Sequence, residues 1–182
     1  LRTALLIILT LSSTLATAQQ GPVSLGAYCG DSHRSPTRQI DKAVKALNAK
    51  DYPNAGVYIG AALRVNEGDQ HALYLRGELG MRTKRFELAE ASWKRLVQRC
   101  PGYKPDLLYF VGSLALAAGR PEEAQRYLEQ WLLRDDREYA YDSEVEDMLE
   151  EIGLKATFLA NPVPFDPKPA RAINTRFDEY LA

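Results

Sequence analysis

Hydrophobic and polar positions follow a helical period along most of the chain, and one pattern of them recurs. The segments KRFELAEASWKRLV and GRPEEAQRYLEQWL share a skeleton in which Ala89 corresponds to Ala124 and Trp93 to Leu128, while the charged positions differ. An earlier copy is centred on Ala55, so the three alanines lie 34 and 35 positions apart. This is the period of the tetratricopeptide repeat, a helix–turn–helix unit of about 34 residues.

Other positions of the repeat keep the same offsets. They are glycines in the first helix, aromatic residues in the turn and large apolar residues in the second helix, namely Gly77 and Gly112, Tyr52 and Phe86, and Ile59, Trp93 and Leu128. Two helices pack closely where their side chains are small, so we expect Gly77 to face Ala89 and Gly112 to face Ala124. One unit cannot bury its apolar face alone, so three or more units have to stack.

Prolines mark where several of the helices begin. Pro36 follows Ser35, a residue that favours the N-cap position, and Pro53, Pro105 and Pro121 each stand at the expected start of another helix. Proline is tolerated there because the first N–H groups of a helix have no partner inside it. The boundaries therefore agree with the repeat period.

A further helix is expected after the third unit. Ser143 and Glu146 have the spacing of a capping box, and one apolar stripe accompanies them, formed by Val145, Leu149, Ile152, Ala156 and Leu159. The sequence therefore predicts an all-α fold, a tetratricopeptide-repeat solenoid of about three units with a C-terminal capping helix. This domain spans residues 36–160, and an extended proline-rich tail over residues 161–182 follows it.

An acidic stretch, DDREYAYDSEVEDMLEE, overlaps the start of this last helix and holds nine acidic residues and one arginine. A site for a cation or for a basic peptide is one interpretation. We favour the other, the solvated outer face of the capping helix, because charges at helical spacing usually face water.

The N-terminus has the features of a signal peptide. Arg2 precedes the apolar run ALLIILTL, and Ala16-Thr17-Ala18 has the small-x-small form of a cleavage site. The apolar run is about half of the ~20 residues that a membrane-spanning helix needs. We therefore expect a signal peptide over residues 1–18, a mature exported chain from Gln19, and a linker over residues 19–35.

Composition and motifs argue against several classes of protein. The chain has 182 residues, of which 46% are hydrophobic and 26% charged, as expected for one globular domain. A net charge of -1 disfavours nucleic acid as a partner. The sequence contains no G-x-S-x-G, no H-E-x-x-H and no phosphate-binding glycine loop. His33 and His71 lack the spacing of metal ligands. We expect a protein that is not an enzyme and that binds no metal or small-molecule cofactor.

Two cysteines are present, Cys29 in the loop-like GAYCGDSHRSP and Cys100 just before Pro101. Export would allow them to form a disulfide, because exported proteins fold in oxidising compartments. The alternative is one buried and one exposed thiol. Both interpretations stay open at this point.

The first helices of such units line a groove, which is where a partner would bind. The side chains expected there are Ile40 and Val44, then His71, Tyr74, Glu78 and Arg82, then Asp106, Tyr109 and Ser113. Tyrosines among mixed charges suit a peptide or protein segment, because aromatic rings supply contact area at low entropic cost. Packing of Tyr74 and Tyr109 between units is the alternative. Repeat domains that clamp a C-terminal carboxylate carry basic and amide side chains where Ile40 and Val44 stand.

The C-terminal segment NPVPFDPKPARAINTRFDEYLA carries four prolines in its first nine residues, which favours an extended linker. NPVPFxP, a spacer, and then IN and DEYL resemble a junction in exported, PorE-like proteins of the Bacteroidota. In that family a tetratricopeptide domain leads into a TolB-like β-propeller and then an OmpA-like peptidoglycan-binding domain. The resemblance implies that this chain is the N-terminal piece of a longer protein.

The same resemblance implies a location and a role. We expect an exported, periplasmic protein associated with the outer membrane. Its role would be that of a non-catalytic protein–protein interaction scaffold in an envelope assembly such as type IX secretion. The expected partner is an envelope protein or peptide, with peptidoglycan bound only through domains absent from this chain. The alternative is a structural spacer that positions the propeller and the peptidoglycan-binding domain and binds nothing in its groove.

Overall fold

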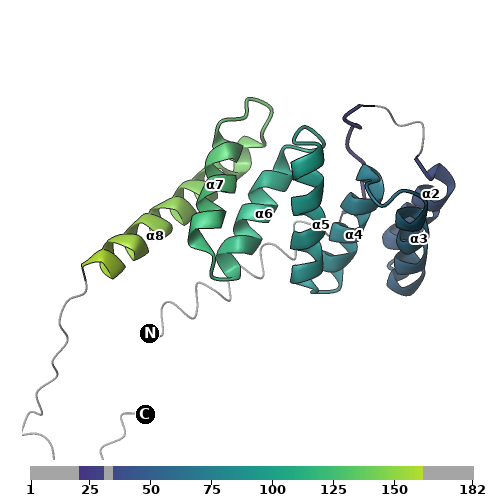
Figure 1. The fold of residues 1–182 in the computed structure, drawn as a ribbon, viewed down its shortest axis with the longest axis horizontal. Coiled ribbons are helices and arrows are strands. Elements are labelled where there is room, and N and C mark those ends of the chain that lie inside the picture. Colours follow the sequence, from purple (N-terminus) through teal and green to yellow (C-terminus); the bar gives the residue numbers. More distant parts are fainter. Residues whose placement is uncertain (1–20, 31–34, 162–182) are drawn as a thin grey trace, which may run out of the picture.

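The computed structural model describes residues 21–30 and 35–161, and these residues form seven α-helices, one short 3₁₀ helix and no strand (Figure 1). The helices are α2 (Thr37–Asn48), α3 (Tyr52–Val65), α4 (Gln70–Arg82), α5 (Phe86–Arg99), α6 (Asp106–Ala117), α7 (Pro121–Leu132) and α8 (Asp142–Ala160), and the 3₁₀ helix is η1 (Tyr139–Tyr141). The predicted signal peptide and most of the proline-rich tail lie outside the described residues. None of the described helices is both long enough and apolar enough to cross a membrane.

The helices pair into three hairpins that stand side by side (Figure 1). Helices α2 and α3, α4 and α5, and α6 and α7 pack most extensively within each pair, and less between neighbouring pairs. Helix α8 packs against α7. The prediction of an all-α, three-unit repeat solenoid with a terminal helix is therefore confirmed.

The three hairpin turns share one backbone structure. Lys50, Lys84 and Gly119 have φ angles of 58°, 56° and 74°, in the left-handed region. The next residue of each turn donates its N–H to a carbonyl five positions earlier: Asp51 to Ala46 at 2.8 Å, Arg85 to Gly80 at 2.7 Å and Arg120 to Ala115 at 3.0 Å. This bond defines a Schellman motif, which satisfies helix C-terminal carbonyls. The turn residues lie 34 and 35 positions apart, so the period in the sequence is a structural repeat.

Close contact between paired helices follows a different register from the predicted one. A Cβ atom on Gly77 would collide with the indole ring of Trp93, and one on Gly80 would collide with the backbone of Ala89. A Cβ atom on Gly112 would likewise meet the side chain of Leu128, at 2.8 Å, and it would lie 3.4 Å from the carbonyl oxygen of Ala124, so the expected approach of Gly112 to Ala124 is present. The expected contact between Gly77 and Ala89 is therefore wrong. The alanine lies opposite a position one helical turn nearer to the hairpin turn, and the repeated glycine makes room for the large second-helix residue.

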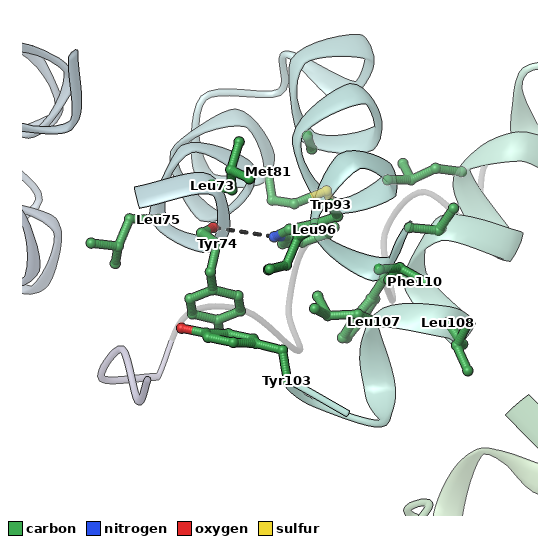
Figure 2. Close-up of a cluster of buried hydrophobic side chains, with 14 of the residues drawn as sticks. Leu73, Tyr74, Leu75, Met81, Trp93, Leu96, Tyr103, Leu107, Leu108 and Phe110 are labelled. Carbon is green, nitrogen blue, oxygen red and sulfur yellow. Dashed lines mark hydrogen bonds between the residues drawn. The ribbon is translucent and has the colours of Figure 1, made fainter. Parts of the chain in front are cut away.

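Trp93 and its neighbours form the centre of the core (Figure 2). The indole Nε1 donates to the carbonyl oxygen of Tyr74 at 3.1 Å, so a fully buried tryptophan keeps its hydrogen bond. Its ring lies 5.5 Å from that of Phe110 in the next unit. One side chain thereby joins the packing within a unit to the packing between units.

Helix α8 differs from its prediction at both ends. It begins at Asp142, directly after η1, and no side chain caps it, so the predicted capping box of Ser143 and Glu146 does not form. The helix continues through Gly153, but two residues of the predicted stripe, Ala156 and Leu159, are exposed, Leu159 by 83%. The predicted apolar stripe is thus buried only in its first half, because α8 extends beyond α7.

The acidic stretch is divided between two structures rather than forming one helix face. Its first residues lie in the connection between α7 and α8, and the others lie on α8. Two arginines pair with acids of the connection and the helix start, with Arg134 Nη2 2.7 Å from Asp136 and Arg137 Nε 3.0 Å from Asp142.

Candidate interaction site

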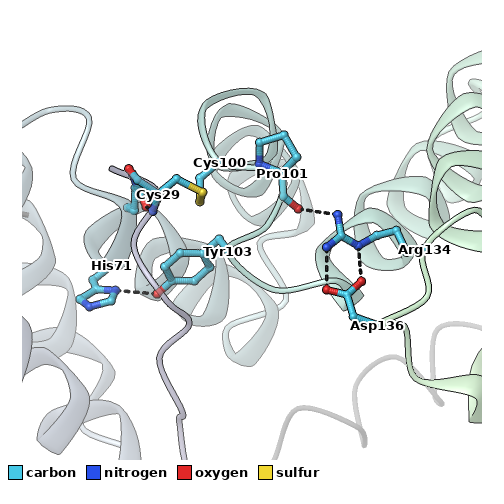
Figure 3. Close-up of a disulfide and its surroundings, with 8 residues drawn as sticks. Cys29, His71, Cys100, Pro101, Tyr103, Arg134 and Asp136 are labelled. Atoms are coloured by element: carbon cyan, nitrogen blue, oxygen red, sulfur yellow. Dashed lines mark hydrogen bonds and ion pairs between the residues drawn. A yellow bond between two sulfur atoms is a disulfide. The ribbon is translucent and has the colours of Figure 1, made fainter. Parts of the chain in front are cut away.

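Residues 21–30, which we call the N-terminal segment, lie along helix α4. Gly21 contacts Arg82 at the C-terminal end of the helix, and Cys29 contacts Gln70 at its N-terminal end, so the segment runs antiparallel to α4. The structure assigns no helix or strand to the segment. A helix of this length spans ~20 Å, so the segment must be extended to reach both ends. Figure 3 shows it passing His71 and Tyr103.

Helix side chains pair with the backbone of the segment. The Gln70 amide makes two such bonds, accepting from the N–H of Cys29 and donating to its carbonyl oxygen, both at 2.9 Å. The N–H of Val23 donates to Asn48 Oδ1 at 2.8 Å, and Arg82 Nη2 donates to the carbonyl oxygen of Gly21 at 2.7 Å. Four backbone groups of the segment are therefore satisfied by side chains of the first two units.

Cys29 and Cys100 form a disulfide, with their Cα atoms 5.5 Å apart (Figure 3). Cys100 follows the end of α5 and is completely buried, whereas Cys29 is an exposed residue. Of the two alternatives left open by the sequence, the structure contains the bonded form. The bond fixes one end of the N-terminal segment to the second unit.

A charged network lies beneath the segment. The Glu78 carboxylate accepts a hydrogen bond from the Tyr74 hydroxyl at 3.0 Å and one from Arg82 Nε at 3.3 Å. Lys104 Nζ lies 3.4 Å from the same hydroxyl and donates to Ser24 Oγ of the segment at 2.9 Å. Glu78 is only 4% exposed, and this burial raises the pKa of its carboxyl, an effect that Tyr74, Arg82 and Lys104 oppose.

An aromatic cluster holds the end of the segment near Cys29. The Tyr28 hydroxyl donates to Asp69 Oδ2 at 2.7 Å, and its ring centre lies 4.1 Å from that of His71. Burial raises the pKa of Tyr28 to about 12. His71 Nδ1 lies 2.8 Å from the Tyr103 hydroxyl, and burial lowers the pKa of His71, so the ring is neutral at neutral pH. The cluster therefore consists of uncharged phenol and imidazole groups around one buried carboxylate.

The predicted groove residues of the third unit lie elsewhere. Tyr109 and Ser113 are 2% and 0% exposed. The ring of Tyr141, next to α8, stacks on Tyr109 at 4.4 Å, and Ser113 Oγ donates to the Tyr109 carbonyl oxygen at 2.9 Å. Asp106 is partly buried, which raises the pKa of its carboxyl, as do the nearby acids Glu138 and Asp136. The expectation that Tyr109 and Ser113 line an open groove is not met, because η1 and the start of α8 cover them.

The predicted groove is thus split into two parts. His71, Tyr74, Glu78 and Arg82 come together under the N-terminal segment, and Tyr109 and Ser113 come together under η1 and α8. Ile40 is buried and Val44 packs partly against the core, so neither forms an open surface.

Several residues that contact the segment were not predicted. They are Asn48, Asp69, Gln70, Tyr103 and Lys104, and with His71, Tyr74 and Arg82 they form what we call the segment-binding face. Most lie at the end of α2, on α4 or just before it, whereas Tyr103 and Lys104 lie in the connection between α5 and α6. One signal, the possible Cys29–Cys100 disulfide, indicated that the segment comes near the end of α5, but an extended segment of mixed residues has no helical period that would place it along α4.

The described part of the chain contains no candidate metal centre. None of its His, Cys, Asp and Glu side chains gather in groups of three or more that could hold a metal ion. A shallow hollow between α5 and α7 contains Gln98, Arg126 and Arg134. The Arg134 guanidinium there is already paired with Asp136 and with the carbonyl oxygen of Pro101.

No protein-family model, no curated protein and no solved structure matches this chain.

Proposed function

We propose that this protein is a non-catalytic interaction scaffold whose segment-binding face holds an extended polypeptide. One observation carries the proposal: side chains of α2 and α4 pair with the backbone of an extended segment laid along α4. In a β-sheet a neighbouring strand supplies such bonds, whereas here Asn48, Gln70 and Arg82 supply them.

This arrangement suits recognition of one chain segment by another. Amide and guanidinium side chains bind backbone groups whatever the residue type, and Tyr74 and Tyr103 add aromatic contact area. In this structure the segment belongs to the same chain. A partner would have to take its place or bind beside it.

The proposed location is the periplasm, in an assembly at the outer membrane such as type IX secretion. It is supported by the signal-like sequence of residues 1–18 and by the resemblance of residues 161–182 to the family junction. A disulfide between Cys29 and Cys100 fits an oxidising compartment. Peptidoglycan would be bound only by domains beyond this chain.

A structural spacer is the second candidate. The observation that favours it is that both parts of the predicted groove are covered within the chain, by the N-terminal segment and by α8. A spacer requires rigidity, and the disulfide supplies it.

The test is binding of a free peptide by a variant that cannot hold its own segment. Gly26→Val with Cys29→Ser, in the full chain, should displace the segment, because a Cβ at Gly26 would collide with the backbone of Tyr103. The probe is a fluorescein-labelled peptide, GPVSLGAYSG, copied from the segment with serine for Cys29. We expect saturable binding by fluorescence anisotropy.

A matched variant identifies the surface responsible. Adding Asn48→Ala and Gln70→Ala removes three of the four backbone hydrogen bonds and should weaken peptide binding at least tenfold. Unchanged helical circular dichroism shows that each variant is folded. Absence of binding to the displaced variant would reject the scaffold proposal and favour the spacer.

A further inference from the structure

The N-terminal segment occupies the place of a bound peptide, and its contacts indicate which residues a competing peptide needs. Building on the proposed function, we infer that residues 21–30 act as a displaceable internal ligand, released by reduction of Cys29–Cys100. The partner that then binds is an extended segment with a glycine opposite Tyr103 and a tyrosine two residues later.

The glycine requirement follows from backbone contact. At Gly26 a Cβ atom would lie inside 3.0 Å of the carbonyl carbon and oxygen of Tyr103, which belong to the backbone and cannot rotate away. Gly21 and Gly30 show no atom within 4 Å of a Cβ. Of these three glycines, only Gly26 excludes a side chain by contact with the face, whereas Gly30 favours glycine through its own φ of 81°.

The tyrosine requirement follows from hydrogen bonding. Asp69 is 1% exposed, and its two carboxylate oxygens accept from different donors: Oδ1 from the N–H of Ala72 at 2.8 Å and Oδ2 from the Tyr28 hydroxyl at 2.7 Å. Without a phenol at this place the second oxygen would lose its partner. An unpaired buried carboxylate oxygen is costly, so a competing segment has to bring a donor.

Hydrogen bonds and the packing of two partly buried side chains, Val23 and Leu25, hold the segment in addition to the disulfide. Its middle residues are exposed or partly exposed, and each hydrogen bond to it contributes about 1 kcal/mol. The peptide chain already joins the segment to α2, and the disulfide adds a second tether at Cys29, which raises the effective concentration of the segment at the face. A free peptide therefore competes less well while both tethers are in place.

The bond is open to reduction from one side. A thiolate of an external dithiol attacks the sulfur of exposed Cys29, and the buried Cys100 sulfur leaves as a thiolate and takes up a proton. The second thiol of the reductant then displaces Cys29, forming the disulfide of the oxidised reductant. Two electrons pass from the dithiol to the protein, and both cysteines end as thiols. A dithiol oxidoreductase is the class of partner that would do this.

The experiment measures binding of the labelled GPVSLGAYSG peptide to the full wild-type chain, oxidised and after dithiothreitol. We expect an apparent Kd at least tenfold lower for the reduced protein, and no redox effect in the Gly26→Val, Cys29→Ser variant. A peptide with valine for Gly26 should not bind. Gly21→Val is the matched control, and it should retain the redox response of the wild type because its Cβ meets open space.

The outcomes separate the two proposals. If the displaced variant binds the peptide but reduction leaves the wild type unchanged, control by the disulfide is wrong and the scaffold stands. If the valine peptide binds as well as the glycine peptide, the proposed partner chemistry is wrong. If the displaced variant, shown to be folded, binds neither peptide, both proposals fall.

Discussion

The turn residue of each hairpin adopts a left-handed backbone, but only Gly119 is a glycine. Lys50 and Lys84 bear a Cβ that crowds the following carbonyl oxygen in this conformation, at a cost of about 1–2 kcal/mol. The Schellman hydrogen bonds of the turns offset this cost, because they satisfy carbonyl groups at the end of the first helix of each unit. The first two units therefore tolerate a strain that the third avoids.

This strain gives the first prediction. Lys84→Gly should raise the free energy of unfolding by about 0.5–1 kcal/mol, since relief of the strain exceeds the added entropy of the unfolded chain. Gly119→Ala should lower it by about 1 kcal/mol for the same reason. Urea unfolding of the oxidised chain measures both. Gly102→Ala is the control, because Gly102 has an ordinary φ and open space around it; a loss of stability in Lys84→Gly would contradict the argument.

At the scale of helices, the sequence period was enough to predict the pairs and their order. It was not enough to predict which residues touch. Gly77 meets Trp93 rather than Ala89, because the crossing of α4 and α5 decides the contact and linear spacing does not encode it. The exposure of the second half of the α8 stripe has the same cause, because the apolar pattern of α8 does not show where α7 ends.

The contrast between two helical glycines gives the second prediction. Gly77→Ala should lower the free energy of unfolding by about 1–3 kcal/mol, because its Cβ would collide with a fully buried, hydrogen-bonded Trp93 ring. Gly153→Ala should raise it by about 1 kcal/mol, because alanine favours helix and nothing lies near the new methyl group. Thermal or urea denaturation followed by circular dichroism measures both. Equal effects of the two substitutions would show that the helix register described here is incorrect.

The site was predictable in part at this scale. Placing His71, Tyr74, Glu78 and Arg82 on one face of a first helix follows from the repeat register, and the structure puts all four beside the N-terminal segment. The same register placed Tyr109 and Ser113 correctly on α6. Their burial under η1 and α8 depends on packing between non-equivalent elements, which a repeat period cannot show.

For the whole molecule, the disulfide determines how the first two units are joined. It closes a loop of 71 residues from the N-terminal segment to the end of α5, enclosing α2, α3, α4 and α5. A cross-link of this span restricts the unfolded chain far more than the folded one, which amounts to about 4 kcal/mol in the chain-entropy model. The bond therefore affects both the stability of the fold and the occupancy of the segment-binding face by residues 21–30.

The third prediction separates these two effects. Reduction should lower the free energy of unfolding in urea by up to about 4 kcal/mol, while the helical circular dichroism without denaturant stays unchanged. Cys29→Ser should reproduce the loss and make the protein insensitive to dithiothreitol. Hydrogen exchange at Val23 and Cys29, whose N–H groups are bonded to Asn48 and Gln70, should speed up on reduction, because these bonds then open without unfolding of the helices. If these two amides stay as protected as before while stability falls, the disulfide serves stability alone and the segment is a fixed part of the solenoid.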